Sequence, residues 1–252
     1  MDNLRISTRT AVSKITSSIN LQNLYDNLEI DDSIKFIQFK ENPEKGINYK
    51  LSEKKKKRNN KKKKKKFYNQ LTLHYFDEKI VNVKIFNNGK CQMTGLKYEN
   101  HGIKIIKNII EIIKKNKNVD EIVTNTDLKY DDYKIVLINS DFNIGYKIDR
   151  NNLHRHINNI EMYSSYEPLI YPGVNIKYYY NTNNNNGICN CNCKCEGKGN
   201  GNGNGNCIRI TIAVFESGSI LITGKINNNI LKIAYDFINK LLLTNKNKFI
   251  LI

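Results

Sequence analysis

The chain contains the sequence FNNGKCQMTG at Phe86–Gly95 and the related sequence FESGSILITG at Phe215–Gly224. Both begin with Phe, have Gly at the fourth position and end in Thr-Gly, and they are 129 residues apart. Glycine readily takes the positive φ that a tight hairpin turn requires, so each stretch predicts a turn between two strands. The repetition predicts that this hairpin occurs twice.

The same offset relates residues well outside the two hairpins. The further pairs are Ile19-Asn20 with Ile148-Asp149, Asn23-Leu24 with Asn152-Leu153, and Ile109 with Ile238. A constant offset across distant segments is hard to obtain by chance, and it decides the architecture. We therefore predict a tandem duplication, with one repeat over 1–118 and a second over 130–252, which together form one domain.

Each repeat contains one low-complexity insert, and the two inserts fall at roughly equivalent places. The first insert, 51–66, is rich in lysine, and the second, 181–206, is rich in Asn, Cys and Gly. Segments of this composition lack the apolar residues that a core needs. We expect neither insert to contribute to the core.

The formal net charge of this 252-residue chain is +17, and much of it comes from the first insert. Lys54–Arg58 and Lys61–Lys66 carry five and six positive charges, eleven in all, which leaves +6 elsewhere. The positive charge outside the insert suggests a polyanionic partner, whereas the lysine run alone is more typical of a solvated loop or a nuclear-import signal.

Membrane and secretion signals are not evident in the sequence. The apolar stretches are far shorter than the ~20 residues of a membrane span, and the start MDNLRISTRT has no apolar signal-peptide core. We expect an intracellular protein without membrane partners.

The remaining sequence predicts the same order of elements in both repeats. Expected strands are 4–15, 69–76, 81–87 and 90–96, then 133–146, 173–180, 207–216 and 219–225. Asn20 and Asp149 are candidate N-caps of helices 20–29 and 149–161, and a longer amphipathic helix closes each repeat. This order predicts an α+β fold with helices on one face of an antiparallel sheet and the other face open.

The sequence SSYEPLIYPG at Ser164–Gly173 resembles the SSYEPELFPG signature of the TATA-box-binding protein family. Phe86–Gly95 and Phe215–Gly224 are similar to that family's two F-x-S-G-K-x-V-x-T-G hairpins, and Asp132–Phe142 matches a third motif more loosely. The resemblance covers nearly the whole chain apart from the inserts. It implies a pseudo-two-fold saddle whose curved antiparallel sheet lies on the DNA minor groove, with helices on the convex face. With the Asn- and Lys-rich composition, it suggests a divergent member from a large DNA virus or a protist, located in the nucleus or in a cytoplasmic viral factory.

The resemblance places Phe86 and Phe215 at positions where the family drives wedges between base steps to kink DNA. The alternative is an ordinary strand Phe that faces the core. Because both residues lie beside the turn in matched positions, we favour wedges.

Each repeat of the family has a second wedge. Tyr171 matches this position in the second repeat, where the family has Phe. In the first repeat, counting back from the hairpin gives Phe67 or Tyr68, whereas the repeat offset applied to Tyr171 gives Asn42. The lysine-rich insert leaves these alternatives open.

Minor-groove edges distinguish A·T from G·C but little else, so recognition there rests on apolar contact, a few hydrogen bonds and the cost of bending. The groove-facing positions that the resemblance implies are Thr8, Thr10, Gln92, Thr94, Asn139, Ala213, Leu221 and Thr223. Thr8 and Leu137 stand where the family has asparagines, Lys84 replaces a leucine and Gln92 a valine. These departures argue against recognition of the TATA consensus sequence itself, but not against binding in the minor groove. Lys90 matches a phosphate-side lysine, although a solvated surface lysine is equally compatible with the sequence.

Glu167, Pro168 and Leu169 match the loop, or stirrup, that docks transcription factor IIB in the family. The resemblance therefore implies a general transcription initiation factor that binds and bends A/T-rich duplex DNA and recruits a factor-IIB-like protein and RNA polymerase. The alternative is a protein-interaction adaptor of the same fold that no longer binds DNA specifically. An RNA-binding module is disfavoured because no aromatic-rich RNP signature occurs on a central strand.

The cysteines of the second insert alternate as C-x-C-x-C-x-C at Cys189, Cys191, Cys193 and Cys195. Thiolates so placed are candidate ligands for Zn²⁺ or Cu(I), but structural zinc sites usually use C-x₂₋₄-C pairs. We predict no bound metal, and name these four as the ligands if one binds. Because no catalytic constellation stands out among the four histidines and the acidic residues, we also predict no enzyme activity and no cofactor.

Overall fold

The computed structural model describes residues 3–48, 68–124, 128–182, 184–189, 191 and 207–251. The chain forms two compact units. The first-repeat unit is Arg9–Ile135, and the second-repeat unit is Met1–Thr8 with Val136–Ile252. The units follow the two predicted repeats, except that strands β1 (Arg5–Lys14) and β7 (Asp131–Asn143) contribute residues to both.

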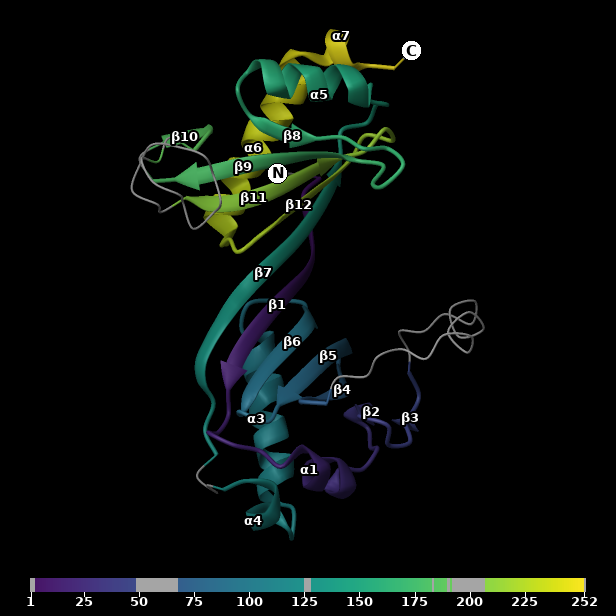
Figure 1. Ribbon diagram of the computed structural model, residues 1–252, viewed down its shortest axis with the longest axis vertical. Helices are drawn as coiled ribbons and strands as arrows, with labels where there is room; N and C mark the ends of the chain where they lie inside the picture. Colours follow the sequence, from purple (N-terminus) through teal and green to yellow (C-terminus); the bar gives the residue numbers. More distant parts are fainter. Residues whose placement is uncertain are drawn as a thin grey trace. The chain divides into compact units, whose positions relative to one another are not determined.

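The first-repeat unit is an antiparallel sheet with helices on one face. Its strand order is β1–β6–β5–β4–β2–β3. The bounds are Lys90–Leu96 for β6, Lys79–Phe86 for β5, Gln70–Asp77 for β4, Ile34–Phe39 for β2 and Lys45–Gly46 for β3. The helices are α1 (Leu21–Asn27), α3 (His101–Lys114) and α4 (Val119–Ile122). In Figure 1, α3 lies behind β5 and β6.

Alternation along the strands of this unit separates a helix-covered face from an open face. The side chains of Val81, Val83 and Ile85 in β5 are buried, whereas those of Lys84 and Phe86 are half-buried on the other face. The buried set forms one core with the apolar stripe of α3. Each aliphatic side chain buried in this way stabilises the fold by roughly 1.5–3 kcal/mol. One face of the sheet is therefore committed to the core, which leaves the other available for binding.

The second-repeat unit has the same plan. Its strand order is β10–β9–β11–β12–β7, and β8 also pairs with β9. The bounds are Asn184–Gly187 for β10, Val174–Asn181 for β9, Ile208–Val214 for β11, Ser219–Gly224 for β12 and Tyr163–Ser165 for β8. The helices are α5 (Arg150–Asn159), α6 (Asn228–Thr244) and α7 (Lys246–Phe249). Helix α6 crosses behind β9 and β11 in Figure 1.

Backbone hydrogen bonds repeat at the offset that the sequence predicts. In each unit, two N–H groups that follow the first strand donate to carbonyl oxygens of the hairpin turn. The bonds are Ile15 to Gly89 (2.9 Å) and Ile19 to Asn87 (2.8 Å), then Ile144 to Gly218 (3.0 Å) and Ile148 to Glu216 (2.9 Å). The donor and the acceptor of each bond in the second unit follow their counterparts in the first unit by 129 residues.

The two predicted N-caps are confirmed. The Asn20 side chain accepts hydrogen bonds from the N–H groups of Gln22 and Asn23, both at 3.1 Å. The Asp149 side chain accepts one from the N–H of Asn152 at 3.0 Å. These bonds satisfy N–H groups that have no partner within the helix.

The sequence pattern does not predict β2, β3, β8 or β10. In β2, Ile34, Phe36, Ile37 and Phe39 are all buried. A register shift between Ile34 and Phe36 breaks the strict alternation that identifies a strand in sequence. Strand β2 is therefore hidden by a local irregularity of the backbone.

The expectation that insert 181–206 contributes nothing to a core is wrong at its edges. Strand β10 pairs with β9, and Cys189 and Cys191 are buried together with Tyr179 and Cys207. The low-complexity composition hides these contacts because the buried cysteines are few among many Asn and Gly residues.

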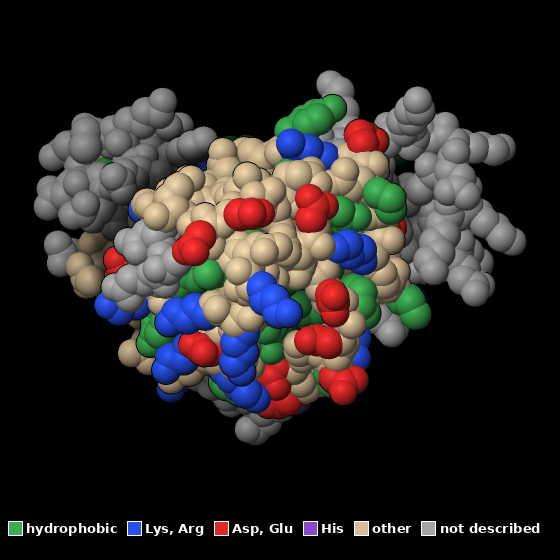
Figure 2. Space-filling view, turned by 90° about the horizontal axis from the view of Figure 1, so that it is seen from below, with side chains coloured by type: hydrophobic (Ala, Val, Ile, Leu, Met, Phe, Trp, Pro, Cys, Tyr) green, Lys and Arg blue, Asp and Glu red, His purple; other side chains and the backbone are tan. Residues whose placement is uncertain are grey.

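Basic and acidic side chains are interspersed on the face of the molecule in Figure 2. Mixed charges of this kind are typical of an ordinary solvated surface. Among the described residues, no helix is long and apolar enough to cross a membrane.

Candidate nucleic-acid interface

Two predicted wedge residues of the second-repeat unit form an aromatic pair. The ring centroids of Tyr171 and Phe215 are 5.7 Å apart, with an interplanar angle of 60°. Both side chains are half-buried, and Phe215 directly follows β11. Gly173 lies against both rings, since a Cβ at that position would lie 3.0 Å from Tyr171 and 3.1 Å from Phe215. A larger residue there would push the two rings apart.

Arg150, at the start of α5, fastens the loop that carries Tyr171 to the neighbouring hairpin. Its Nη1 donates to the carbonyl oxygen of Pro172 at 2.7 Å, and its Nη2 pairs with the Glu216 carboxylate. The guanidinium also lies 5.4 Å from the Tyr166 ring centroid. Arg150 therefore positions the aromatic pair, and nothing in the local sequence signals this role.

A row of polar side chains crosses the open face of the second-repeat unit. Strand register places Lys177 opposite Thr211, Thr211 opposite Thr223, and Thr223 opposite Asn139. The Lys177 ammonium donates to Thr211 Oγ1 at 3.0 Å. The structure thus brings the predicted Thr223 and Asn139 together and adds Lys177 and Thr211, which sequence reasoning missed.

The next row combines apolar and charged groups. Ala213 lies between Asn175 and Leu221, and these larger neighbours leave it buried, whereas Leu221 is exposed. Opposite Leu221 is Asp141, whose carboxylate pairs with the Arg5 guanidinium at 3.0 Å. The pair neutralises an acidic group on a face that we expect to meet phosphates. Ala213 is therefore less accessible than its predicted role suggests.

A hollow of about 480 Å³ opens on the same unit, lined in part by Leu137, Arg209 and Lys225. Burial lowers the pKa of the neighbouring Lys177 ammonium, and Arg209 lowers this pKa further. Positive charges therefore crowd this region, and a bound anion would relieve their repulsion.

The open face of the first-repeat unit carries the corresponding side chains. Phe86 ends β5 and is half-buried, Gln92 lies opposite Lys84, and Thr94 lies opposite Thr10. The hydroxyl oxygens of Thr10 and Thr94 are 3.3 Å apart. Thr10 is buried beside Thr94, so of the two it is Thr94 that offers a hydroxyl at the surface.

Strand register supports one of the alternatives for the remaining first-repeat wedge. Gln70 lies opposite Phe86 across β4 and β5. In the second-repeat unit, extending the register of Val214 opposite Val174 by one residue places Gly173 opposite Phe215. Tyr68 precedes Gln70 by two residues, and Tyr171 precedes Gly173 by two residues, so the two tyrosines correspond. Tyr68 is 69% exposed and is therefore accessible to a DNA partner.

The other two alternatives have less support. Asn42 is half-buried, and its amide nitrogen donates to Gln22 Oε1 at 3.1 Å. Phe67 lies outside the described residues.

Two further predicted positions lie on β1 and β6. Thr8 is half-buried on β1, and Lys90 is exposed at the start of β6. Lys90 lies opposite Lys14 in the antiparallel ladder. Like charges placed opposite each other are destabilising, so this pair favours an anionic partner.

The predicted stirrup is an exposed loop between β8 and β9. Glu167, Pro168 and Leu169 are all exposed, and Ile170 beside them is 86% exposed. The Glu167 carbonyl oxygen accepts hydrogen bonds from the N–H groups of Ile170 and Tyr171, both at 2.9 Å. This turn presents two adjacent apolar side chains to solvent, as a docking loop requires.

Comparison with known proteins gives a sequence relative. No protein-family model matches the chain. It is 30% identical over 262 aligned positions to the TATA-box-binding protein-like protein of Acanthamoeba polyphaga mimivirus. The match covers 95% of this chain, and the chain spans 65% of the length of that relative.

Comparison with solved structures gives the fold. The TATA-box-binding protein of Methanococcus jannaschii matches with a TM-score of 0.53 at 16% identity, over 94% of this chain and 97% of that one. The chain is therefore similar in sequence to a TATA-box-binding protein-like protein and similar in fold to a TATA-box-binding protein. The predicted α+β fold, an antiparallel sheet with helices on one face, is confirmed.

The TATA-box-binding-protein fold accounts for the matched positions of the aromatic and hydroxyl side chains but not for the cysteines. Cys189, Cys191 and Cys207 come together, with their sulfur atoms within 4.8 Å of one another. Cys193 and Cys195 lie outside the described residues, so the cluster shares only two members with the predicted set.

Proposed function

We propose that this chain binds double-stranded DNA in the minor groove through the open sheet faces and acts as a transcription initiation factor. The observation that carries the proposal is the aromatic pair of Tyr171 and Phe215 at the edge of an open face, matched by Tyr68 and Phe86 at the same strand register. Aromatic side chains that end a polar sheet face have the shape needed to part base steps.

The side chains on the open faces suit the chemistry of the minor groove. Thr94, Thr223 and Asn139 offer hydroxyl and amide groups for the acceptors on the groove floor, and Leu221 offers apolar contact. Lysine and arginine at Lys90 and Arg209 are placed to contact phosphates, which position a protein without reading sequence.

The stirrup supports recruitment of a second protein. We infer that Glu167, Pro168 and Leu169 dock a factor-IIB-like protein, which would bring in an RNA polymerase. The support is the exposure of this apolar loop next to the aromatic pair.

The Asp141 carboxylate on the open face favours the second candidate function, a protein-interaction adaptor. A carboxylate on the open face would repel phosphates if its partner moved away. The half-buried Lys84 and Gln92, which are polar where the family is apolar, also favour the adaptor.

Neither candidate function requires catalysis. The described Ser164–His154 hydrogen bond of 2.7 Å involves a buried hydroxyl that also donates to Asn158, so it offers no accessible nucleophile.

Fluorescence anisotropy on labelled A/T-rich and G/C-rich duplexes tests the proposal. We expect tighter binding to the A/T-rich duplex and at least a tenfold loss of affinity in Tyr171→Ala, because removing a wedge forfeits its contact with unstacked bases. The control is Leu243→Ala, which removes an exposed apolar side chain from α6. A folded protein that binds neither duplex at low salt would leave the adaptor as the function.

A further inference from the structure

Three buried cysteines converge at one edge of the second-repeat unit. Cys189 and Cys191 follow β10, and Cys207 immediately precedes β11. The Sγ atoms of Cys191 and Cys207 are 3.3 Å apart, and those of Cys207 and Cys189 are 3.6 Å apart. With Tyr179 these residues form a separate buried cluster.

Hydrogen bonds among the three thiols are too weak to explain why these cysteines lie together. A thiol is a poor hydrogen-bond donor and acceptor, so mutual contacts of three such groups stabilise the edge little. A zinc ion offers a stronger reason. With Zn–S bonds of about 2.3 Å in a tetrahedron, thiolate sulfurs lie roughly 3.8 Å apart, close to the spacing found here.

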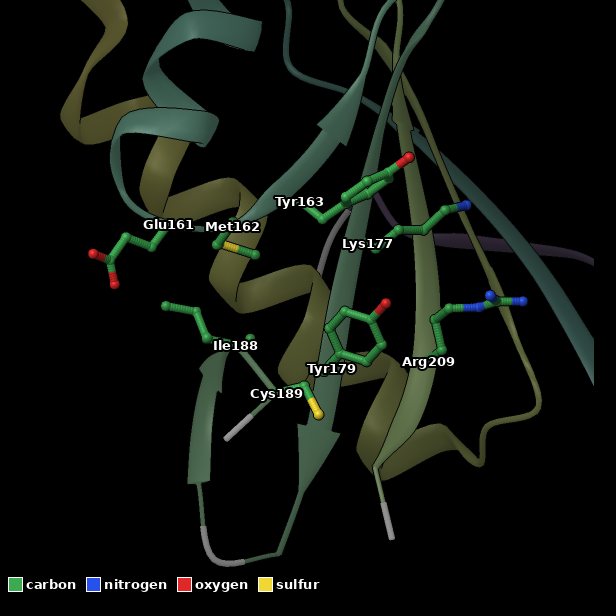
Figure 3. A pocket seen from close by; sticks show the side chains of 9 residues that line it. Glu161, Met162, Tyr163, Lys177, Tyr179, Ile188, Cys189 and Arg209 are labelled. Carbon is green, nitrogen blue, oxygen red and sulfur yellow. The ribbon is translucent and has the colours of Figure 1, made fainter. Parts of the chain in front are cut away.

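The cluster borders a cavity at this edge of the unit. Cys189 lines a cavity of about 370 Å³ together with Lys177, Tyr179 and Arg209, and Figure 3 shows Cys189 next to the Tyr179 ring.

We propose that Cys189, Cys191 and Cys207 bind one Zn²⁺ ion as thiolates. The ion fastens the end of β10 to the start of β11 and so closes the second insert at its base. Zn²⁺ in proteins has four ligands in a tetrahedron, so these three thiolates leave one coordination position for a further ligand. The site is independent of the proposed DNA binding, because it needs only this edge of one unit.

Elemental analysis of the full chain, purified in reducing buffer without chelator, tests the site. We expect one zinc per chain in the wild type and a loss of at least fivefold in Cys207→Ser. Cys91→Ala is the matched control, since it also removes one buried cysteine but in the core of the other unit, and it should keep one zinc. Absence of zinc from the wild type, copper in its place, or equal zinc in Cys207→Ser would overturn the proposal.

Thiol alkylation of the wild type covers the case in which Cys207→Ser does not fold. Cys189, Cys191 and Cys207 should resist alkylation in the zinc-loaded protein and react after chelation, while Cys91 stays protected in both states. Unchanged labelling after chelation, or a disulfide between Cys191 and Cys207 under reducing conditions, would contradict zinc ligation.

Discussion

Single residues explain why the hairpins adopt their shape. Gly218 has φ +78° and Gly145 has φ +84°, in the left-handed region that favours glycine. A Cβ at Gly218 would overlap the carbonyl oxygen of Tyr146, whereas a Cβ at Gly145 would meet no atom within 4 Å. The two glycines share a backbone conformation but differ in the space around them.

This difference gives a prediction with an internal control. Gly145→Ala should destabilise the fold by about 1–2 kcal/mol, the cost of a left-handed alanine. Gly218→Ala should cost at least about 1 kcal/mol more, because the backbone must also move to relieve the overlap. Urea unfolding followed by circular dichroism measures both. Equal shifts of the midpoint in the two variants would show that the close approach of Tyr146 has no energetic weight.

Some site residues can be predicted from sequence because they lie within a motif, and others cannot. Phe215 and Tyr171 belong to motifs that can be recognised in a single sequence, and the structure brings them together. Arg5 and Asp141 are 136 residues apart, so their ion pair depends on strand register that local pattern does not encode. Arg150 is hidden for the same reason, since its contacts at Pro172 and Glu216 are distant in sequence.

Among the elements, hairpins and amphipathic helices are predicted well, and irregular strands are not. Helices α3 and α6 have long apolar stripes, and β5 alternates strictly. Strand β2 contains a register shift, and β10 lies in low-complexity sequence, so neither shows a periodic pattern. A periodic pattern of apolar residues therefore predicts a helix or a strand only where the backbone of that element is regular.

The stirrup yields a prediction at the scale of one loop. Combined Glu167→Arg and Leu169→Ala should abolish a ternary complex with a factor-IIB-like protein and DNA, because the loop loses both its charge and its apolar tip. DNA affinity should stay within about twofold, well under the tenfold that about 1.4 kcal/mol represents. A gel-shift titration measures both quantities.

The control for this experiment is Leu243→Ala, which removes an exposed leucine from α6 and should form the ternary complex normally. A doubly substituted protein that assembles at wild-type concentrations would move partner recognition away from the stirrup.

At the scale of the whole molecule, the duplication is the property that sequence predicts best. The offset of 129 residues reappears in the backbone hydrogen bonds of both hairpins. The inserts, by contrast, differ in length and composition, so the repeat offset does not identify Tyr68, the wedge that we propose for the first repeat. Strand register supplies that position instead, through the pairing of Gln70 with Phe86.

The central claim is that both units use aromatic wedges to bend DNA. Energy transfer between dyes at the two ends of a short A/T-rich duplex measures the bend directly. We expect transfer to rise when the wild type binds, to rise less with Phe86→Ala or Phe215→Ala, and to change little when the double variant is bound at saturation, because each wedge contributes one kink. A double variant that saturates the duplex and bends it as strongly as the wild type would contradict the account.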